Sequence, residues 1–269
     1  MNINLIKQNS LGTLKLYCPN LFYYISDKDF LLFIDKAIRH TYPKGGTDKN
    51  NFIVTFFKLV NEHKLNDSNE IRNEFAYFNF LLGKSIQIGI NQTKFRDLII
   101  STLYNFELNN FLNAIGEIAA LLDISNGYKF INYEVPLPNG KNVDFQLESA
   151  STKININVDV SNIYHDTDRY ENEKNFETFI RKRLHDKYTA KTNDLPETEK
   201  NKVYIFPIIH GLTIKIIQSN SEFLIDINKS STQYANSFQS FSPRVFANMG
   251  GLYYGLFSIP EFIKLGPKS

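Results

Sequence analysis

The stretch PNGKNVDFQLESASTKININVDVSNI, residues 138–163, decides the fold class that this sequence predicts. Apolar and polar residues alternate along residues 143–148 and again along residues 154–161. A period of two is typical of β-strands that cover one face and leave the other face polar. A PNG turn precedes the first segment and a SAST turn separates the two, so we expect two neighbouring strands.

Each predicted strand carries an aspartate on its polar side, Asp144 on the first and Asp159 on the second. If the strands pair with their apolar sides together, the two carboxylates converge on one face. Neighbouring carboxylates repel each other unless a cation lies between them, and hard oxygen ligands suit Mg²⁺ or Mn²⁺. Such a metal can activate water and stabilise the charge that develops in phosphodiester cleavage. The alternative is a hairpin with a solvated face, on which acidic residues are common.

The segments around this pair predict an α/β order of elements. YKFINYEVPL (128–137) alternates like a strand, and the charged segment 168–191 has helical spacing. KVYIFPIIHG (202–211) is a nearly continuous apolar run, as in a strand that is buried on both faces. In the tail, the runs IKII (214–217), FLIDI (223–227) and VFANMGGLYYGLFSI (245–259) are candidate strands. We therefore expect a core of the order helix–β–β–β–helix–β.

The first part of the chain predicts helices instead. Apolar residues recur at helical spacing in several segments, and one of them is expected to close at Gly83. The predicted helices are 27–43, 49–65, 67–83, 93–106 and 107–127. We expect a helical region over residues 1–105 and the α/β core over residues 106–269, although no Pro/Gly-rich linker marks the boundary.

The composition restricts the class of protein. With 269 residues, 42% of them hydrophobic and 14% aromatic, the chain can form a substantial core. A net charge of +2 permits a nucleic-acid partner without requiring one. The single cysteine, Cys18, excludes an internal disulfide framework, and we find neither a signal-peptide pattern nor a long apolar run. These features predict a cytoplasmic protein without a membrane partner.

The order of elements resembles that of the PD-(D/E)XK nuclease superfamily. The matching segments lie between residues 106 and 210 and are LNNFLNAIGEIAALLDISNGYKF, PLPNGKNVDFQL, INVDVSNI, FIRKRLHDKYTAK and KVYIFPII. The resemblance implies a restriction-endonuclease-like core, in which helices flank a mixed central sheet. It also implies hydrolysis of phosphodiester bonds, in DNA rather than RNA, with Mg²⁺ or Mn²⁺ as the cofactor.

Three residues take the family's acidic positions. Glu117 corresponds to the carboxylate of the first helix, Asp144 to the motif aspartate, and Asp159 to the second acid, so that Asp144 and Asp159 are the expected metal ligands. The sequence departs from the pattern at Ser161, where the family has a lysine. A serine hydroxyl can hydrogen-bond a metal-bound water but supplies no positive charge. Glu117 is equally compatible with a solvated position.

A lysine from the following helix is the expected substitute. Phe176 and Ile180 belong to the core-facing stripe of that helix, and Lys187 falls between their directions. In the family, catalytic lysines are known to migrate onto this helix, so we expect Lys187 to meet the aspartates. Lys191, one turn further on, is the second choice, and Lys141 in the hairpin turn is the third. The alternative for Lys187 is a helix-end lysine that extends to water.

A basic cluster on the same helix suggests contact with nucleic acid. Arg181, Lys182 and Arg183 could follow a phosphate backbone, together with Lys191 and Lys141. The alternative is a set of salt bridges on a solvated helix.

The helices of residues 1–105 would supply target recognition or dimerisation, which leaves a homodimer open. The rival function is an inactive nuclease-like fold that serves as a nucleic-acid-binding or protein-interaction module. The absence of a lysine at Ser161 is the feature that favours this rival.

Overall fold

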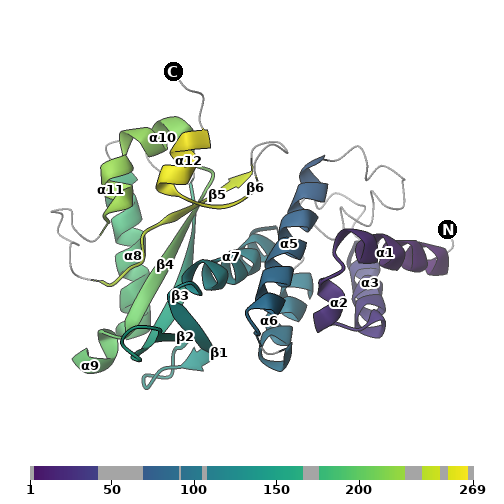
Figure 1. Cartoon of the computed structure of the whole chain (residues 1–269), viewed down its shortest axis with the longest axis horizontal. Coiled ribbons are helices and arrows are strands. Elements are labelled where there is room, and N and C mark those ends of the chain that lie inside the picture. Colours follow the sequence, from purple (N-terminus) through teal and green to yellow (C-terminus); the bar gives the residue numbers. More distant parts are fainter. Residues whose placement is uncertain are drawn as a thin grey trace. The chain divides into compact units, whose positions relative to one another are not determined.

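The structure is a computed structural model of the chain, and Figure 1 shows its elements. It describes residues 3–41, 69–90, 92–104, 108–165, 176–227, 238–248 and 254–265. The helix predicted at residues 49–65 lies outside these ranges. Two compact units are present, one of residues 1–118 with 249–254 and one of residues 119–248 with 255–269. The division therefore falls at 118/119, inside a helix, and not at 105/106 as expected.

The described part of the first unit is helical, as the sequence predicts. Helix α1 packs against α3 and α5, and α2 packs against α6. Phe30, Leu82 and Phe95 are fully buried in this unit. The helices are α1 (Ile3–Tyr17), α2 (Leu21–Tyr24), α3 (Asp27–Thr41), α5 (Asn69–Gln87), α6 (Gln92–Tyr104) and α7 (Leu108–Ile124), the last of which crosses the division.

Helix α5 does not end at Gly83, so that prediction is wrong. The helix continues to Gln87, and Gly83 lies where the chain passes close to α2. A Cβ atom at Gly83 would lie 2.7 Å from Nδ2 of Asn20. That nitrogen donates to the carbonyl of Asn79 at 3.0 Å, and the Asn20 amide donates to the Asn79 side chain at 2.9 Å. The glycine therefore permits a close approach and does not stop the helix.

A six-stranded mixed sheet in the order β1-β2-β3-β4-β5-β6 is the centre of the second unit. Strands β1, β2 and β3 are antiparallel neighbours, and β3, β4 and β5 are parallel neighbours. The strands are β1 (Tyr128–Pro136), β2 (Asn142–Ser149), β3 (Asn155–Tyr164), β4 (Val203–His210), β5 (Arg244–Asn248) and β6 (Tyr254–Ser258). The α/β class with a mixed sheet flanked by helices is confirmed.

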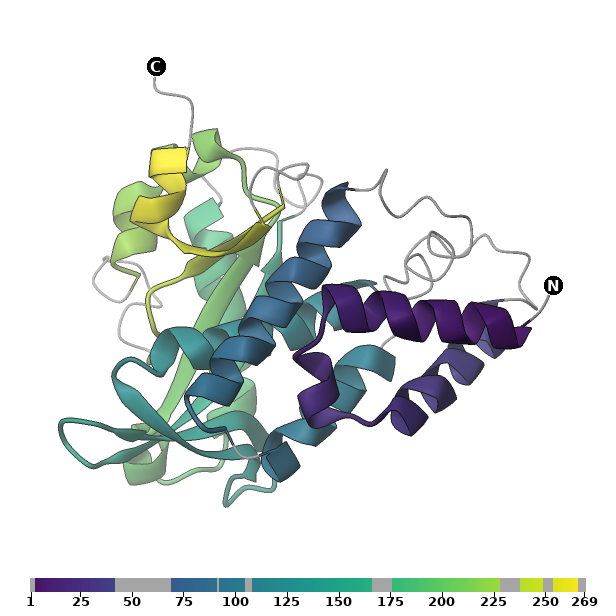
Figure 2. The same cartoon turned by 45° about the vertical axis from the view of Figure 1, so that its right-hand side comes forward.

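Helix α8 (Phe176–Thr192) packs against β3 and β4, and it runs alongside β4 in both views (Figures 1 and 2). Its buried stripe contains Phe176, Ile180 and Leu184, each with no exposed surface. The short helix α9 (Glu197–Lys200) separates α8 from β4. The predicted order helix–β–β–β–helix–β is therefore present from α7 to β4, with α9 added.

Pro207 lies inside β4, although proline cannot donate to a sheet ladder. The amide of Ile205 donates to the carbonyl of Gln239 on the β5 side, and amides two residues apart point the same way. On that side the ladder is interrupted between the bridge Ile205–Ser240 and the pair Ile208–Arg244. The missing N–H of Pro207 faces this interruption, so no ladder bond is lost.

Two of the candidate strands in the tail are helices. Residues 214–217 belong to α10 (Ile214–Ser219), and most of 223–227 belongs to α11 (Ser221–Ile225). The Thr213 side chain accepts a hydrogen bond from the Ile216 amide and starts α10. Both helices pack against α12 (Ile259–Leu265). A short apolar run has no period that separates strand from helix, which is why the sequence prediction fails here.

Candidate functional site

The two predicted carboxylates lie opposite each other on neighbouring strands. Phe145 of β2 pairs with Val158 of β3 in antiparallel register, so the next position across the ladder joins Asp144 and Asp159. Both side chains point to the face of the sheet that α8 covers. The amide of Val160 donates to Oδ2 of Asp144 at 2.6 Å, which ties this carboxylate to the adjacent strand. The convergence predicted from the alternation is present.

Two lysines of α8 reach Asp159. Nζ of Lys187 lies 2.8 Å from Oδ2 of Asp159, and Nζ of Lys191 lies 2.9 Å from Oδ1. The Asp159 side chain has no exposed surface, whereas those of Lys187 and Lys191 are 36% and 22% exposed. Burying a carboxylate is unfavourable unless an opposite charge is paired with it, and here each oxygen of Asp159 has an ammonium partner. Lys191 also donates to the carbonyl of Asn142.

The geometry of α8 explains why both lysines arrive together. Lys187 and Lys191 are four residues apart, so they lie one turn apart on the same side of the helix. The buried stripe of α8 fixes the helix on the sheet, and the two lysine stems extend past it toward β3. The sequence placed Lys187 first and Lys191 second, and the structure brings both to the same carboxylate.

Asp144 has an unusual protonation equilibrium. Burial, and after it the negative charge of Asp159, raise the pKa of Asp144 from its ordinary value near 3.8 to about 7. The hydrogen bond from Val160 and the charges of Lys187 and Lys191 act in the opposite direction. An additional cation near the half-buried Asp144 would therefore stabilise its ionised form.

The other predicted site residues have different positions. Ser161 is buried on the same face of β3, two residues beyond Asp159. Lys141 is exposed in the turn before β2. Glu117 lies half-buried on α7 within the first unit, whereas the aspartates belong to the second unit. Its role as a supporting carboxylate stays a prediction.

The proposed phosphate contact by Arg181 needs correction. Its side chain has no exposed surface, and its Nε donates to Oε1 of Glu177 at 2.9 Å. Its Nη1 donates to the carbonyl of Ile227 at 2.5 Å, and its guanidinium lies 4.7 Å from the ring centre of Phe223. Arg181 therefore holds α8 to the segment after α11. Lys182 and Arg183 are exposed, and their contact with a polyanion stays a prediction.

The turn before β2 has a role that the sequence does not indicate. Nδ2 of Asn139 donates to the carbonyls of Lys191 and Asn193, and the Asn142 carbonyl accepts from Lys191. The NG dipeptide signals a turn but not these partners, which lie about fifty residues away along the chain. Asn157, beside Asp159 on the polar side of β3, is also buried, and Nε2 of Gln146 lies 3.5 Å from its Oδ1.

The donor set suits a metal that retains waters. Within the described ranges, no group of three or more His, Cys, Asp or Glu side chains could hold an ion. Two facing carboxylates are present, and Mg²⁺ is commonly bound by one or two carboxylates, with water and substrate phosphate completing its shell. Asp144 and Asp159 therefore fit Mg²⁺ or Mn²⁺ better than Zn²⁺, which favours nitrogen and sulfur ligands.

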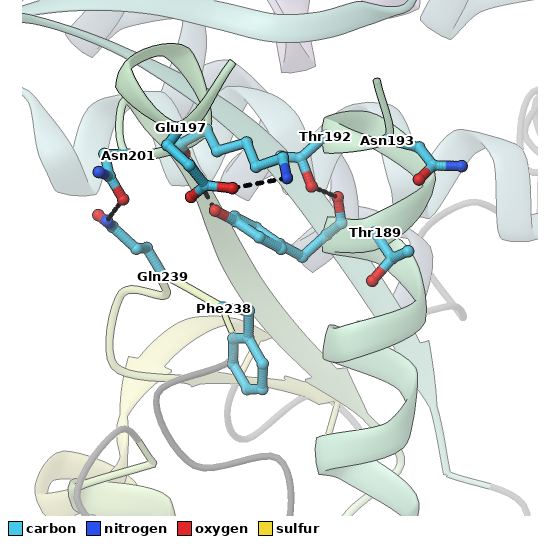
Figure 3. Close-up of a pocket in the computed structure, with 9 residues that line it drawn as sticks. Thr189, Thr192, Asn193, Glu197, Asn201, Phe238 and Gln239 are labelled. Atoms are coloured by element: carbon cyan, nitrogen blue, oxygen red, sulfur yellow. Dashed lines mark hydrogen bonds and ion pairs between the residues drawn. The ribbon is translucent and has the colours of Figure 1, made fainter. Parts of the chain in front are cut away.

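A pocket of about 300 Å³ lies between α8, α9 and the segment before β5 (Figure 3). It does not include the aspartates. The charged groups Glu197 and Lys200 pair with each other at 2.8 Å, so the pocket offers no unpaired charge to a phosphate. Its lining residues are Tyr188, Thr189, Thr192, Asn193, Glu197, Lys200, Asn201, Phe238 and Gln239.

Comparisons with protein-family models, with curated proteins and with solved structures found no match for this chain. None of the helices in the described part of the chain is long and apolar enough to cross a membrane.

Proposed function

We propose that this protein is a metal-dependent nuclease of the PD-(D/E)XK type that hydrolyses DNA phosphodiester bonds. One observation carries the proposal. Asp144 and Asp159 face each other across β2 and β3, and two lysine ammonium groups lie within 3 Å of Asp159. Facing carboxylates with adjacent lysines combine metal ligands with cations that can orient water and stabilise phosphate charge.

Asp144 and Asp159 would hold Mg²⁺ or Mn²⁺. When bound, the ion would supply an activated water and an electrophile for the phosphate. The raised pKa of Asp144 agrees with this assignment, because burial and the charge of Asp159 disfavour its ionised form, which a bound cation would stabilise.

The two lysines receive different roles. Lys187 is the more exposed, at 36% against 22%, so its ammonium is the one that would meet the attacking water or the scissile phosphate. Lys191 bonds Asp159 and the carbonyl of Asn142, which suits a residue that keeps Asp159 in place. Lys187 would thus supply the charge that Ser161 lacks.

One observation favours the rival, a nuclease-like fold without activity. Asp159 is fully buried and each of its oxygens already has an ammonium partner, so the charge of Asp159 is compensated without a metal. In such a module the aspartates and lysines would only hold α8 against the sheet. The exposed Lys182 and Arg183 would remain available to a nucleic-acid partner.

A plasmid-cleavage assay distinguishes the active nuclease from the inactive module. We expect the wild-type protein to nick supercoiled DNA with Mg²⁺ or Mn²⁺ and to be inactive in EDTA. Asp144→Asn and Lys187→Ala should each lower the rate by roughly a hundredfold or more, the usual scale for removing one electrostatic group from a hydrolytic site. The exposed Lys129→Ala, on β1, is the matched control and should cleave like the wild type. Binding of DNA without cleavage under every metal condition would establish the module instead, and equal cleavage by wild type and Asp159→Ala would remove the assigned site.

A further inference from the structure

The turn that precedes β2 has a defined backbone. The amide of Leu137 donates to the carbonyl of Lys141 at 2.7 Å, and the amide of Gly140 donates back to the carbonyl of Leu137 at 2.9 Å. Gly140 has a φ of 77°, in the left-handed region that favours glycine. Asn139 is not among the described residues with positive φ, so its backbone does not require an asparagine.

The Asn139 side chain explains the residue type. Its Nδ2 donates to the carbonyl of Lys191 at 2.9 Å and to that of Asn193 at 2.7 Å. Its Oδ1 accepts from the amide of Lys141 at 3.2 Å, within its own turn. A carboxamide has two N–H donors and one carbonyl acceptor, and this one uses each of them. Aspartate lacks the donors, and serine has only one.

These bonds act on the last turn of α8. The final carbonyls of a helix have no intrahelical partners, and α8 ends at Thr192. Asn139 therefore supplies donors at the end of the helix, where Lys191 is located. The side chain of Lys191 then returns to the same turn, because its Nζ donates to the carbonyl of Asn142 as well as pairing with Asp159.

We infer that Asn139 is a positioning residue for Lys191 of α8. It fixes the carbonyl of Lys191 from one side while Asn142 and Asp159 hold its ammonium from the other. The buried stripe holds α8 on the sheet, and the turn that directly precedes the Asp144 strand thereby holds Lys191 in place relative to the carboxylate pair. The catalytic consequence rests on the proposed nuclease function, but the positioning itself does not.

Amine labelling tests the positioning without relying on activity. Mass spectrometry can follow the acylation of Lys191 relative to that of the exposed Lys182. In Asn139→Ala the relative rate at Lys191 should rise by roughly fivefold or more, because the loss of one net hydrogen bond corresponds to about that factor. Asn126→Ala removes an exposed asparagine of the same unit and should leave the ratio unchanged. An unchanged ratio in Asn139→Ala, in a protein with wild-type circular dichroism, would overturn the inference even if the wild type cleaves DNA.

A double-mutant cycle tests the catalytic consequence. Asn139→Ala should lower kcat for DNA cleavage by roughly fivefold or more while KM changes by less than about twofold. In a Lys191→Ala background the same change should have almost no further effect, because Asn139 acts through Lys191. Additive effects would show a general structural role and contradict the inference. If no variant cleaves DNA, the nuclease proposal fails, while the labelling ratio still decides the positioning.

Discussion

His210 is a buried titratable residue outside the aspartate–lysine cluster. It ends β4, is 6% exposed, and its Nε2 lies 2.9 Å from Oδ1 of Asn162. Its ring stacks on Tyr164, with centres 4.5 Å apart, and lies against Phe246. Burial among these groups lowers the pKa of His210 to about 4, because the charged imidazole would lose its hydration.

This burial predicts a loss of stability in mild acid. The unfolded chain binds the proton with a pKa near 6.5, before the folded protein does. The neutral imidazole of His210 therefore costs no stability above pH 6.5. As pH falls toward 4, keeping it neutral lowers the free energy of unfolding, by about 3 kcal/mol over the whole range. Urea denaturation at pH 7.0 and 4.5 should show that His210→Gln reduces this loss in the free energy of unfolding.

The comparison between variants isolates His210. Asp144 titrates in the same range with the opposite sign, because its raised pKa adds stability as pH falls, and this contribution is common to both proteins. His185→Gln, which removes a half-exposed histidine of α8, is the matched control. Identical pH slopes for the wild type and His210→Gln would show that the buried imidazole does not control the effect.

At the scale of single residues, the sequence predicts directions but not distant partners. The period of two is enough to place Asp144 and Asp159 on one face, and the helical period places Lys187 and Lys191 one turn apart. It does not reveal that Arg181 turns inward, because that depends on the carbonyl of Ile227, 46 residues away. In the sequence, nothing distinguishes the buried Arg181 from its exposed neighbours Lys182 and Arg183.

At the scale of elements, length decides how well the sequence predicts. Long periodic segments are recovered as α3, α5, α6, α7, α8 and the strands from β1 to β4. The short runs at 214–217 and 223–227 fail because a few apolar residues fit either period. The predicted end of α5 at Gly83 is wrong for another reason. Nothing in the sequence indicates that Gly83 lies against the side chain of Asn20, the residue before α2.

Gly83 yields a prediction about helix packing, with Gly12 as its matched control. A Cβ at Gly83 would lie 2.7 Å from an amide that Asn79 holds, whereas at Gly12 in α1 nothing lies within 4 Å. Alanine favours a helix over glycine by about 1 kcal/mol. Gly12→Ala should therefore stabilise the protein by up to about 1 kcal/mol. Gly83→Ala should destabilise it by about 1–2 kcal/mol through loss of the Asn20–Asn79 bonds.

Thermal and urea unfolding of the two alanine variants provide the measurement. Opposite signs in the change of the unfolding free energy are the expected result. If Gly83→Ala were as stabilising as Gly12→Ala, the close approach between α2 and α5 would not constrain the helix. The double variant Gly83→Ala, Asn20→Ala removes the obstructing side chain, so its alanine at residue 83 should no longer be unfavourable.

At the scale of the whole molecule, the division into units follows contacts between distant residues, which composition does not reveal. Helix α7 (Leu108–Ile124) crosses the division at 118/119, so each unit contains part of one continuous helix. Helix formation is cooperative, and a helix that loses half of its length loses stability in the remainder. The sequence contains no linker between the two units because the continuous helix α7 joins them.

The shared helix predicts that the two units unfold together, and Cys18 allows the test. It is the protein's single cysteine, and it lies in the first unit with no exposed surface. Burial raises the pKa of its thiol to about 12, so the thiol should react only after unfolding. We expect the urea midpoint of Cys18 labelling to coincide with that of hydrogen exchange in β4, in the second unit. Gly116→Pro, which breaks α7 in its interior, should separate the two midpoints. Labelling of wild-type Cys18 at a clearly lower urea concentration than exchange in β4 would show that the units unfold independently despite the continuous helix.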